Sequence, residues 1–271
     1  MTIKNDMEQR LSWERELSSA LSHLPLSLFC YETTDSTNTQ AKNYVLEGGR
    51  GAAAFVANEQ TAGRGRMGRS FFSPGDTGIY LSLLCPVAGV LRDAVAWTTG
   101  ASVAVARAIS AETGIEVGIK WVNDLYYRER KVCGILAESF LWEDQRYVIL
   151  GVGINLSTTD FPEELSLRAG SLMTESGDRK LPLTAALVKT LYAMMTEGAP
   201  SDWMEEYRRR STVLGYPITY RIDGREYRGQ AVAIEDDGAL LVLDEDGGKQ
   251  RLSSGEITLR LRETKGGIAH E

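Results

Sequence analysis

A chain of 271 residues, 43% hydrophobic and 25% charged, has the composition of an ordinary globular protein with room for one large domain and a small second one. Its net charge of −7 removes the bulk electrostatic attraction on which nucleic-acid binding depends. The longest uncharged stretches, 17–31 and 77–91, contain proline and are shorter than the roughly 20 apolar residues of a membrane span. The N-terminus lacks the basic-then-apolar pattern of a secretory signal, so we expect a cytoplasmic protein without membrane contact.

Histidine and cysteine set narrow limits on the chemistry. The two histidines, His23 and His270, lie near the chain ends, so a Ser-His-Asp or Cys-His arrangement lacks its imidazole base. Catalysis would therefore use lysine, arginine, carboxylates and backbone amides. Cys30, Cys85 and Cys133 are widely spaced, which indicates buried thiols rather than a disulfide framework or a zinc site.

Residues 1–25 predict a single N-terminal helix. Trp13, Leu17 and Leu21 are apolar at helical spacing, and Pro25 closes the segment. A helix-turn-helix DNA reader needs at least two helices and a turn, and this segment is too short to hold one.

Residues 26–212 alternate strands and helices irregularly, so we expect an α+β domain rather than a regular β-α-β repeat. Apolar runs predict strands at 26–33, 52–58, 79–84, 116–120, 125–127, 132–139 and 146–156. Helical spacing predicts helices at 37–47, with Ser36 near the N-cap, and at 92–113, 183–196 and 201–211.

Residues 213–271 have a different pattern. Short alternating strands at 217–222, 226–234, 239–244 and 248–252 are separated by Asp-Gly turns. This pattern predicts a small C-terminal β-barrel, with a domain boundary near residue 212.

The segment 60–69, Gln-Thr-Ala-Gly-Arg-Gly-Arg-Met-Gly-Arg, is the least ordinary stretch. Its glycines match G-x-G-x-x-G, but a dinucleotide motif must open a helix and precede an acidic residue about 20 positions later. Ser73-Pro74-Gly75 follows instead, and residue 88 is alanine, so that reading fails. Glycines let backbone N–H groups approach an anion, and arginines add planar forks for carboxylate or phosphate. A solvated basic loop or a short nucleic-acid-binding segment fits the pattern equally well, although the acidic net charge disfavours nucleic acid.

A second polar cluster lies at 120–125 and 130–136, around a short strand, and predicts a hairpin. Lys131 is followed at once by apolar residues, so it is either a surface charge with a packed stem or a phosphate-binding group. In 151–155, Gly-Val-Gly-Ile-Asn, two glycines near a strand end indicate a bulge, a ligand close to the backbone or tight packing.

Five motifs, at 35–38, 60–69, 120–125, 130–136 and 151–155, occur in the order and approximate spacing of biotin–protein ligases, which this sequence resembles from about residue 33 to 261. The resemblance implies a catalytic domain related to class II aminoacyl-tRNA synthetases and a C-terminal SH3-like domain. It indicates the monofunctional type without an N-terminal helix-turn-helix domain. The implied substrates are biotin and ATP with Mg²⁺, which give biotinyl-5′-AMP. Biotin then passes to a lysine of a biotin carboxyl carrier domain.

The resemblance also implies the site residues. The implied biotin site comprises Ser36, Thr37, Asn38, Gln60, Gly63, Arg64, Gly65, Lys131, Gly134, Gly151 and Gly153. The implied adenylate site comprises Arg64, Arg66, Arg69, Phe71, Asn123, Lys131 and Asn155, with Asn155 near the adenine and Phe71 covering it. Lys131, Arg66 and Asp124 form the implied catalytic group, in which Lys131 contacts the carboxylate and the α-phosphate. Asp124 is a candidate partner for the incoming lysine, and no protein ligand to a metal is implied.

Two residues depart from the family pattern. Val122 stands where proline is frequent, and Phe71 stands where some members have tryptophan. Neither change removes a charged or hydrogen-bonding group, so we expect altered loop stiffness and stacking rather than altered chemistry.

Other functions compete with this interpretation. A lipoate or octanoate ligase would share the fold, a biotin-sensing repressor would need a DNA-binding domain, and a non-catalytic binding module would leave the charged motifs unexplained. The family also implies a homodimer through the edge of the central sheet as one arrangement.

Overall fold

The computed structural model describes residues 2–87, 94–222, 225–253, 255 and 257–259. Its largest element is a seven-stranded sheet, in which β1 and β2 run parallel and all other neighbours run antiparallel. In order across the sheet, the strands are β1 (Ser27–Thr34), β2 (Ala53–Gln60), β3 (Gly78–Val87), β7 (Gln145–Asn155), β6 (Arg130–Trp142), β5 (Asp124–Tyr127) and β4 (Gly118–Lys120). This mixture confirms the predicted α+β class.

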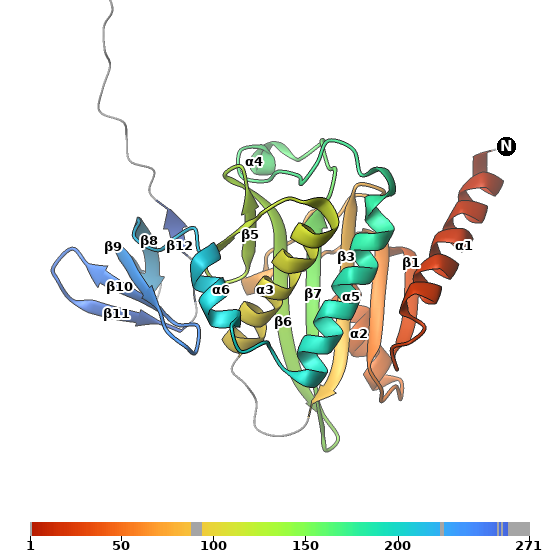
Figure 1. Ribbon diagram of the computed structural model, residues 1–271, viewed down its shortest axis with the longest axis horizontal. Helices are drawn as coiled ribbons and strands as arrows, with labels where there is room; N and C mark the ends of the chain where they lie inside the picture. Colours follow the sequence, from red (N-terminus) through yellow and green to blue (C-terminus); the bar gives the residue numbers. More distant parts are fainter. Residues whose placement is uncertain (1, 88–93, 223–224, 254, 256, 260–271) are drawn as a thin grey trace, which may run out of the picture.

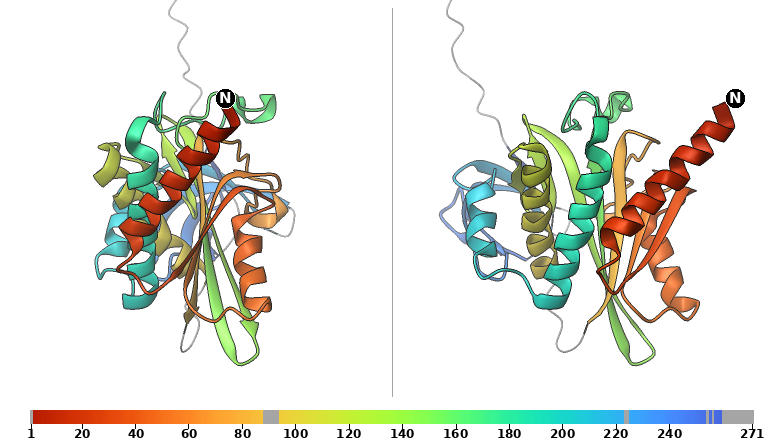
Figure 2. Two further views of the ribbon diagram at one scale, coloured as in Figure 1. Left: turned by 90° about the vertical axis from the view of Figure 1, so that its right-hand side faces the viewer. Right: turned by 45° about the vertical axis from the view of Figure 1, so that its right-hand side comes forward.

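Helices cover both faces of this sheet (Figure 1). On one face lie α3 (Ala94–Thr113) and α5 (Lys180–Glu197), with α1 (Thr2–Leu21) packed beside α5. On the other face lies α2 (Thr37–Leu46), and the turned views show the sheet between these layers (Figure 2). Since both faces are covered, the central strand β3 is an almost continuous buried run rather than an alternating one.

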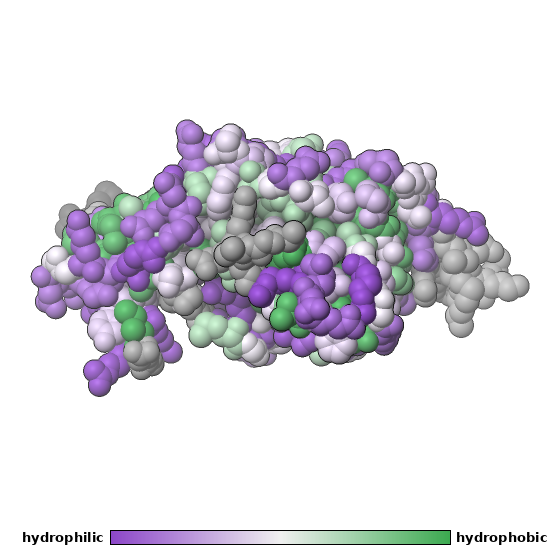
Figure 3. All heavy atoms as spheres, turned by 90° about the horizontal axis from the view of Figure 1, so that it is seen from below, coloured by the Kyte–Doolittle hydropathy of each residue, from purple (hydrophilic) through white to green (hydrophobic). Residues whose placement is uncertain are grey.

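The remaining elements are short. They are α4 (Glu163–Ser166), α6 (Trp203–Arg210) and the 3₁₀ turns η1 (Arg66–Gly68) and η2 (Gly177–Arg179). In the part of the chain that the structure describes, no helix combines the length and apolar character that crossing a membrane requires. Seen from below, the surface is mainly hydrophilic, with apolar side chains in small separate patches (Figure 3).

The C-terminal residues form a second, five-stranded antiparallel sheet. Its order is β11 (Lys249–Leu252), β10 (Leu240–Asp244), β9 (Arg225–Ile234), β8 (Pro217–Ile222) and β12 (Ile257–Leu259). The first four strands were predicted, whereas β12 is too short to give a pattern of its own.

The structure differs from the predicted elements mainly at their ends. The β6–β7 hairpin continues past residue 139 to Trp142, and α5 begins three residues before the predicted helix. The first two residues of the helix predicted at 92–113 lie outside the described residues. Cys85 and Cys133 are buried, as predicted, and Cys30 is half-buried. Burial raises the pKa of Cys85 to about 12 and also raises that of Cys133, so neither thiol is a nucleophile at neutral pH.

A shared apolar core joins the two sheets. It combines Val103 of α3, Trp121 and Val122 after β4, and Tyr207 of α6 with the inner face of the C-terminal sheet, for example Ile218. The Trp121 indole Nε1 donates to the carbonyl oxygen of Gly238, 2.9 Å away in the β9–β10 turn. The C-terminal sheet is therefore packed against the segment that leads into β5.

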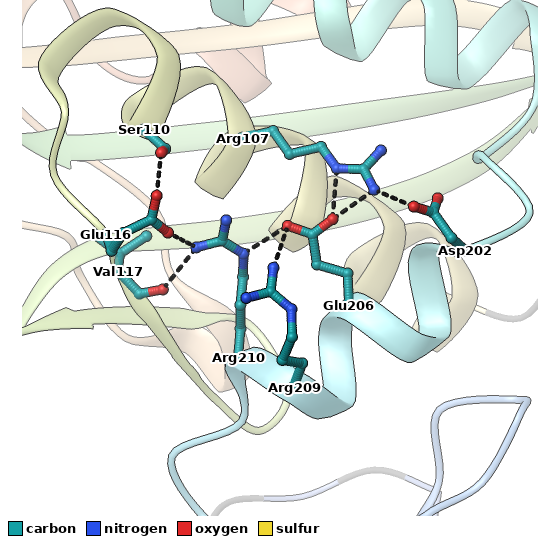
Figure 4. Close-up of polar contacts among 8 residues, drawn as sticks. All are labelled: Arg107, Ser110, Glu116, Val117, Asp202, Glu206, Arg209 and Arg210. Atoms are coloured by element: carbon teal, nitrogen blue, oxygen red, sulfur yellow. Dashed lines mark hydrogen bonds and ion pairs between the residues drawn. The ribbon is translucent and has the colours of Figure 1, made fainter.

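An ion-pair network fixes α6 against α3 (Figure 4). The Glu206 carboxylate accepts hydrogen bonds from Arg107 Nε and Arg210 Nε, each 2.7 Å away, and Arg210 also donates to Glu116 at 2.6 Å. Partial burial opposes ionisation of Glu206, but the hydrogen bonds from Arg210 and Arg107 outweigh it and lower the pKa of this carboxyl. Glu206 is therefore a charged anchor of the contact between α6 and α3.

Replacing Glu206 by glutamine should lower the free energy of unfolding by about 2 kcal/mol at pH 7, because the guanidinium groups of Arg107 and Arg210 each lose one of their two anionic partners. The folded-state pKa of Glu206 is depressed, so its contribution is present above the unfolded value of about 4.3 and is lost as pH falls through the folded value. The difference between wild type and Glu206→Gln, measured by urea denaturation, should therefore shrink below about pH 4.

The matched control is Glu226→Gln. Glu226 pairs with Arg221 at 3.6 Å, and both side chains are at least half exposed. This control should change the free energy of unfolding by less than about 0.5 kcal/mol. A Glu206 effect no larger than that of the control would contradict the assigned role.

Candidate active site

Three glycines leave the middle of the sheet bare on the face that α2 covers. Gly134 of β6 lies opposite Gly153 of β7, and Gly151 lies two residues before Gly153 on the same face. A Cβ at Gly153 would lie 2.5 Å from Cε1 of Phe71, and one at Gly151 would lie 2.1 Å from Oδ1 of Asn38. Two side chains therefore pack on the bare backbone: the ring of Phe71, from the loop at 60–71 (the glycine–arginine loop), and the amide of Asn38, from α2.

An open cavity of about 450 Å³ lies over these glycines. Its lining combines neutral hydrogen-bonding side chains with cationic ones. The lining residues are Ser36, Thr37, Asn38, Gln60, Arg64, Gly65, Arg66, Phe71, Leu81, Asn123, Lys131, Gly134, Ile135, Leu136, Gly151, Val152 and Gly153.

Hydrogen bonds connect the neutral side chains of this lining to one another and to residues next to them. Gln60 Oε1 accepts from the backbone N–H of Thr37 at 2.8 Å and from its hydroxyl at 3.1 Å, and Gln60 Nε2 donates to Ser73 Oγ at 2.9 Å. Ser82 Oγ lies 2.7 Å from Thr37 Oγ1 and 2.5 Å from Asn38 Oδ1. The side chains of Thr37, Asn38 and Gln60 thus each have a defined orientation.

Asp35 holds the turn that leads into α2. Its carboxylate accepts from the backbone N–H of Ser36 at 2.6 Å, Gln40 Nε2 at 2.9 Å and Thr34 Oγ1 at 3.1 Å. Partial burial opposes ionisation, but the hydrogen bonds from Gln40, Ser36 and Thr34 outweigh it and lower the pKa of Asp35. A charged Asp35 therefore presents Ser36 and Thr37 to the cavity at neutral pH.

The glycine–arginine loop is a small hairpin. The backbone N–H of Gly65 donates to the Arg69 carbonyl oxygen at 2.7 Å, and that of Phe71 donates to the Gly63 carbonyl oxygen at 2.8 Å. At its tip, Met67 and Gly68 have positive φ angles of 56° and 74°. Two arginines of the hairpin contact the rest of the domain: Arg64 Nη2 donates to Glu138 Oε1 at 2.8 Å, and Arg66 Nη1 donates to Asn123 Oδ1 at 3.1 Å.

A second cavity of about 620 Å³ shares Gly65, Arg66, Phe71, Asn123 and Lys131 with the first. Its other lining residues are Met67, Arg69, Ser70, Lys120, Trp121, Asp124, Gly255 and Ile257, so the C-terminal sheet contributes to it. In this cavity Lys131 Nζ lies 2.7 Å from Asp124 Oδ1. Four basic side chains make the second cavity suitable for an anion such as phosphate.

Buried contacts hold Asn123 and Asp124 in place. The Asn123 side chain donates to the Ile135 carbonyl oxygen at 2.9 Å, and the backbone carbonyl oxygen of Asn123 accepts from the Ile135 N–H at 3.0 Å. One residue earlier, the Val122 carbonyl oxygen accepts from the Tyr207 hydroxyl at 3.0 Å. Burial raises the pKa of Tyr207, so this phenol stays protonated and can donate.

The structure brings most of the residues implied by the sequence into these two cavities. Gly63 and Asn155 are described but are not among the residues lining either one. A Cβ at Gly63 would lie 2.4 Å from the Phe71 carbonyl oxygen, so this glycine permits close packing in the hairpin. Asn155 is buried, and its Nδ2 donates to the Gly170 carbonyl oxygen at 3.1 Å.

Sequence reasoning missed residues that line neither cavity but hydrogen-bond to residues of the site or next to it. Ser82 interrupts an apolar strand with a buried hydroxyl, and Glu138 carries a charge on the same face of β6 as Gly134. A polar residue in an otherwise apolar strand is a signal that could have pointed to both. Tyr207 gives no such signal, because its partner Val122 is distant in the sequence.

Two adjoining cavities form the candidate site: neutral polar groups and three cations line the first, and four basic side chains and Asp124 line the second. The model of the biotin/lipoate A/B protein ligase family matches residues 30–155. A second model, the biotin protein ligase C terminal domain, matches residues 213–260.

Two named relatives extend the match. The bifunctional ligase/repressor BirA of Bacillus spizizenii is 33% identical over 84% of this chain and 71% of the relative. The biotin–[acetyl-CoA-carboxylase] ligase of Mycobacterium tuberculosis is 33% identical over 74% of this chain and 77% of the relative. The chain therefore belongs to the biotin/lipoate A/B protein ligase family.

A solved structure agrees with this assignment. The biotin protein ligase from Aquifex aeolicus in complex with biotin and ATP superposes with a TM-score of 0.69 at 28% identity. The superposition covers 86% of this chain and 98% of that one. Similarity thus extends over both the catalytic region and the C-terminal sheet.

Replacing Tyr207 by phenylalanine should lower the free energy of unfolding by about 1–2 kcal/mol, because the buried Val122 carbonyl oxygen loses a hydrogen bond. The change can be measured by urea denaturation at pH 7. Tyr147→Phe is the matched control, because Tyr147 is also fully buried but its hydroxyl has no hydrogen-bond partner among the described residues. Equal effects of the two substitutions would show that the Tyr207 hydroxyl contributes nothing specific.

Proposed function

We propose that this chain is an ATP-dependent biotin–protein ligase. It forms biotinyl-5′-AMP from biotin and ATP and transfers biotin to a lysine of a biotin carboxyl carrier domain, without a role in binding operator DNA. The observation that carries the proposal is the pair of adjoining cavities that share Lys131, Arg66 and Phe71. Its net charge of −7 supports the absence of a DNA-binding role.

The first cavity suits the ring system of biotin. A ureido group is neutral and carries both N–H donors and a carbonyl acceptor, and Ser36, Thr37 and Gln60 supply uncharged groups of both kinds. Phe71 and Leu81 add apolar contacts for the rest of the bicyclic ring. The Aquifex aeolicus relative was solved in complex with biotin and ATP, which supports biotin as a ligand.

The shared residues suit the first half-reaction. The biotin carboxylate oxygen attacks the α-phosphorus of ATP, a new P–O bond forms, and the bond to the departing pyrophosphate breaks. The carboxylate is already a nucleophile, so no histidine base is needed. Lys131 and Arg66 lie where the two cavities meet, and there they can reduce the repulsion between carboxylate and phosphate and align them.

Asp124 suits the second half-reaction. The carrier lysine must lose a proton before its amine attacks the acyl carbon, after which the bond to AMP breaks. Asp124 can accept this proton. Its carboxylate is paired with Lys131 in the structure, and an anionic substrate that draws Lys131 away would release it for this task.

Mg²⁺ enters this proposal as a companion of ATP. Among the described residues, no group of three or more His, Cys, Asp or Glu side chains could hold a metal ion. A Mg²⁺ ion that accompanies a nucleotide usually takes phosphate oxygens, water and one or two carboxylates, so it would not need such a group. Its chemistry would be to neutralise phosphate charge.

Pyrophosphate release from Mg-ATP tests the adenylation step directly. We expect release with biotin and not with lipoate or octanoate. Lys131→Ala should lower kcat/KM for this release by about 100-fold or more, because a preorganised cation at the reacting phosphate is lost. Lys42→Ala is the control, since Lys42 is exposed on α2 and lies over the Phe140 ring rather than in either cavity.

Two outcomes would contradict the proposal. Release with lipoate or octanoate in place of biotin would keep the chemistry and change the substrate. No release with any of the three acids would leave a binding protein without ligase activity.

Asp124→Asn should slow the transfer of biotin to a carrier domain by about 100-fold while changing adenylate formation little. Single-turnover experiments with preformed biotinyl-5′-AMP separate the two steps. Glu129→Gln is a matched control on the exposed turn of the same β5–β6 hairpin. Equal losses in both steps would show that Asp124 acts only through Lys131.

A further inference from the structure

We propose that Glu138 is a positioning residue that fixes the Asn38 amide and the Arg64 guanidinium relative to each other, and so couples the glycine–arginine loop to α2. This inference rests on the proposed function, because the site it serves is the cavity assigned to biotin. It adds a carboxylate to a site in which the sequence motifs placed neutral groups, glycines and cations.

Glu138 contacts two residues of the cavity lining, Asn38 and Arg64. It lies on β6, on the same face as Gly134, and is paired with Ile149 of β7. Its Oε2 accepts from Asn38 Nδ2 at 2.7 Å, and its Oε1 accepts from Arg64 Nη2 at 2.8 Å. Glu138 is not among the residues lining the two described cavities, so it would act through Asn38 and Arg64.

The carboxylate determines which way the Asn38 amide faces. An ionised carboxylate only accepts hydrogen bonds, so it requires the amide nitrogen to point toward it. The amide oxygen must then point to Ser82 and to the bare backbone at Gly151. Asn38 is 4% exposed, so a reversed amide would leave buried polar groups unsatisfied.

The same carboxylate closes a circuit of polar contacts. From Glu138 the contacts run through Asn38 and Ser82 to Thr37 and Gln60. They continue through Ser73 to the Phe71 carbonyl oxygen in the loop, and the loop returns to Glu138 through Arg64. The chain of contacts thus leaves the glycine–arginine loop at Arg64 and returns to it at Phe71.

Charge balance supports the same role. The lining of the first cavity includes Arg64, Arg66 and Lys131 and no carboxylate. The ring of biotin is neutral, so an arginine turned toward it would form no ion pair with it. Pairing with Glu138 holds the Arg64 guanidinium against β6. The neutral side chains of Ser36, Thr37 and Gln60 can then bind the ring.

The first experiment replaces Glu138 by glutamine, which keeps the shape and removes the charge. Biotin affinity is measured by calorimetry, and KM and kcat by pyrophosphate release. We expect the Kd and KM for biotin to rise about tenfold, with a smaller change in KM for ATP and little change in kcat or melting temperature. Glu143→Gln is the control, since Glu143 pairs with Arg50 at 3.0 Å at the β6–β7 turn, and it should leave all these values unchanged.

A second pair of variants tests the contact itself. Asn38→Asp places two carboxylates at hydrogen-bond distance, and their repulsion should weaken biotin binding strongly. Adding Glu138→Gln to Asn38→Asp restores a donor and acceptor pair with reversed polarity, so the double variant should bind biotin more tightly than Asn38→Asp alone. This comparison decides the matter even if Glu138→Gln alone does not fold.

Three results would overturn the inference. They are an unchanged biotin KM in Glu138→Gln, an equal loss for both substrates with a lower melting temperature, or a double variant no better than Asn38→Asp. Failure of the proposed function looks different, because the wild-type protein itself would then release no pyrophosphate with biotin.

Discussion

A side chain at Gly134, Gly151 or Gly153 would occupy the space that Phe71 and Asn38 fill, so the site exists only because the middle of the sheet is bare. Sheets covered on both faces usually fill such positions with branched apolar residues. Here the missing volume admits a loop ring and a helix amide instead. The cavity, the loop hairpin and the start of α2 all take their positions from this one region of β6 and β7.

The C-terminal sheet reaches this region through a chain of buried contacts. The turn at Gly238 accepts from Trp121, and Val122 in turn accepts from Tyr207. The residues that follow, Asn123 and Asp124, meet Arg66 and Lys131. The position of the reacting groups thus depends on packing between the two sheets as well as on the catalytic domain itself.

Sequence patterns predicted the α+β class, most strand and helix positions and a hairpin around Lys131, because periodicity and turn residues are local signals. For the loop at 60–69 they left three interpretations open: an anion-binding loop, a solvated loop and a nucleic-acid-binding segment. For Lys131 they left two, a surface charge and a phosphate-binding group. Only the family resemblance assigned these residues to a site. Glu138 was not found because its partners Asn38 and Arg64 are far away in the chain. Asn155 matched a motif by position, yet its side chain is buried against Gly170.

The second cavity is lined by Gly255 and Ile257, and Ile257 begins the strand β12 that pairs with β8. These residues follow every strand of the seven-stranded sheet in the chain, so the ribosome adds them after that sheet. Domains generally fold as units during synthesis, in order from the N-terminus. The catalytic region can therefore form its sheet while the chain is still growing, but the lining of the second cavity stays incomplete until residue 257 has been added. A chain cut short before residue 255 would keep the floor of the site and lack one of its walls.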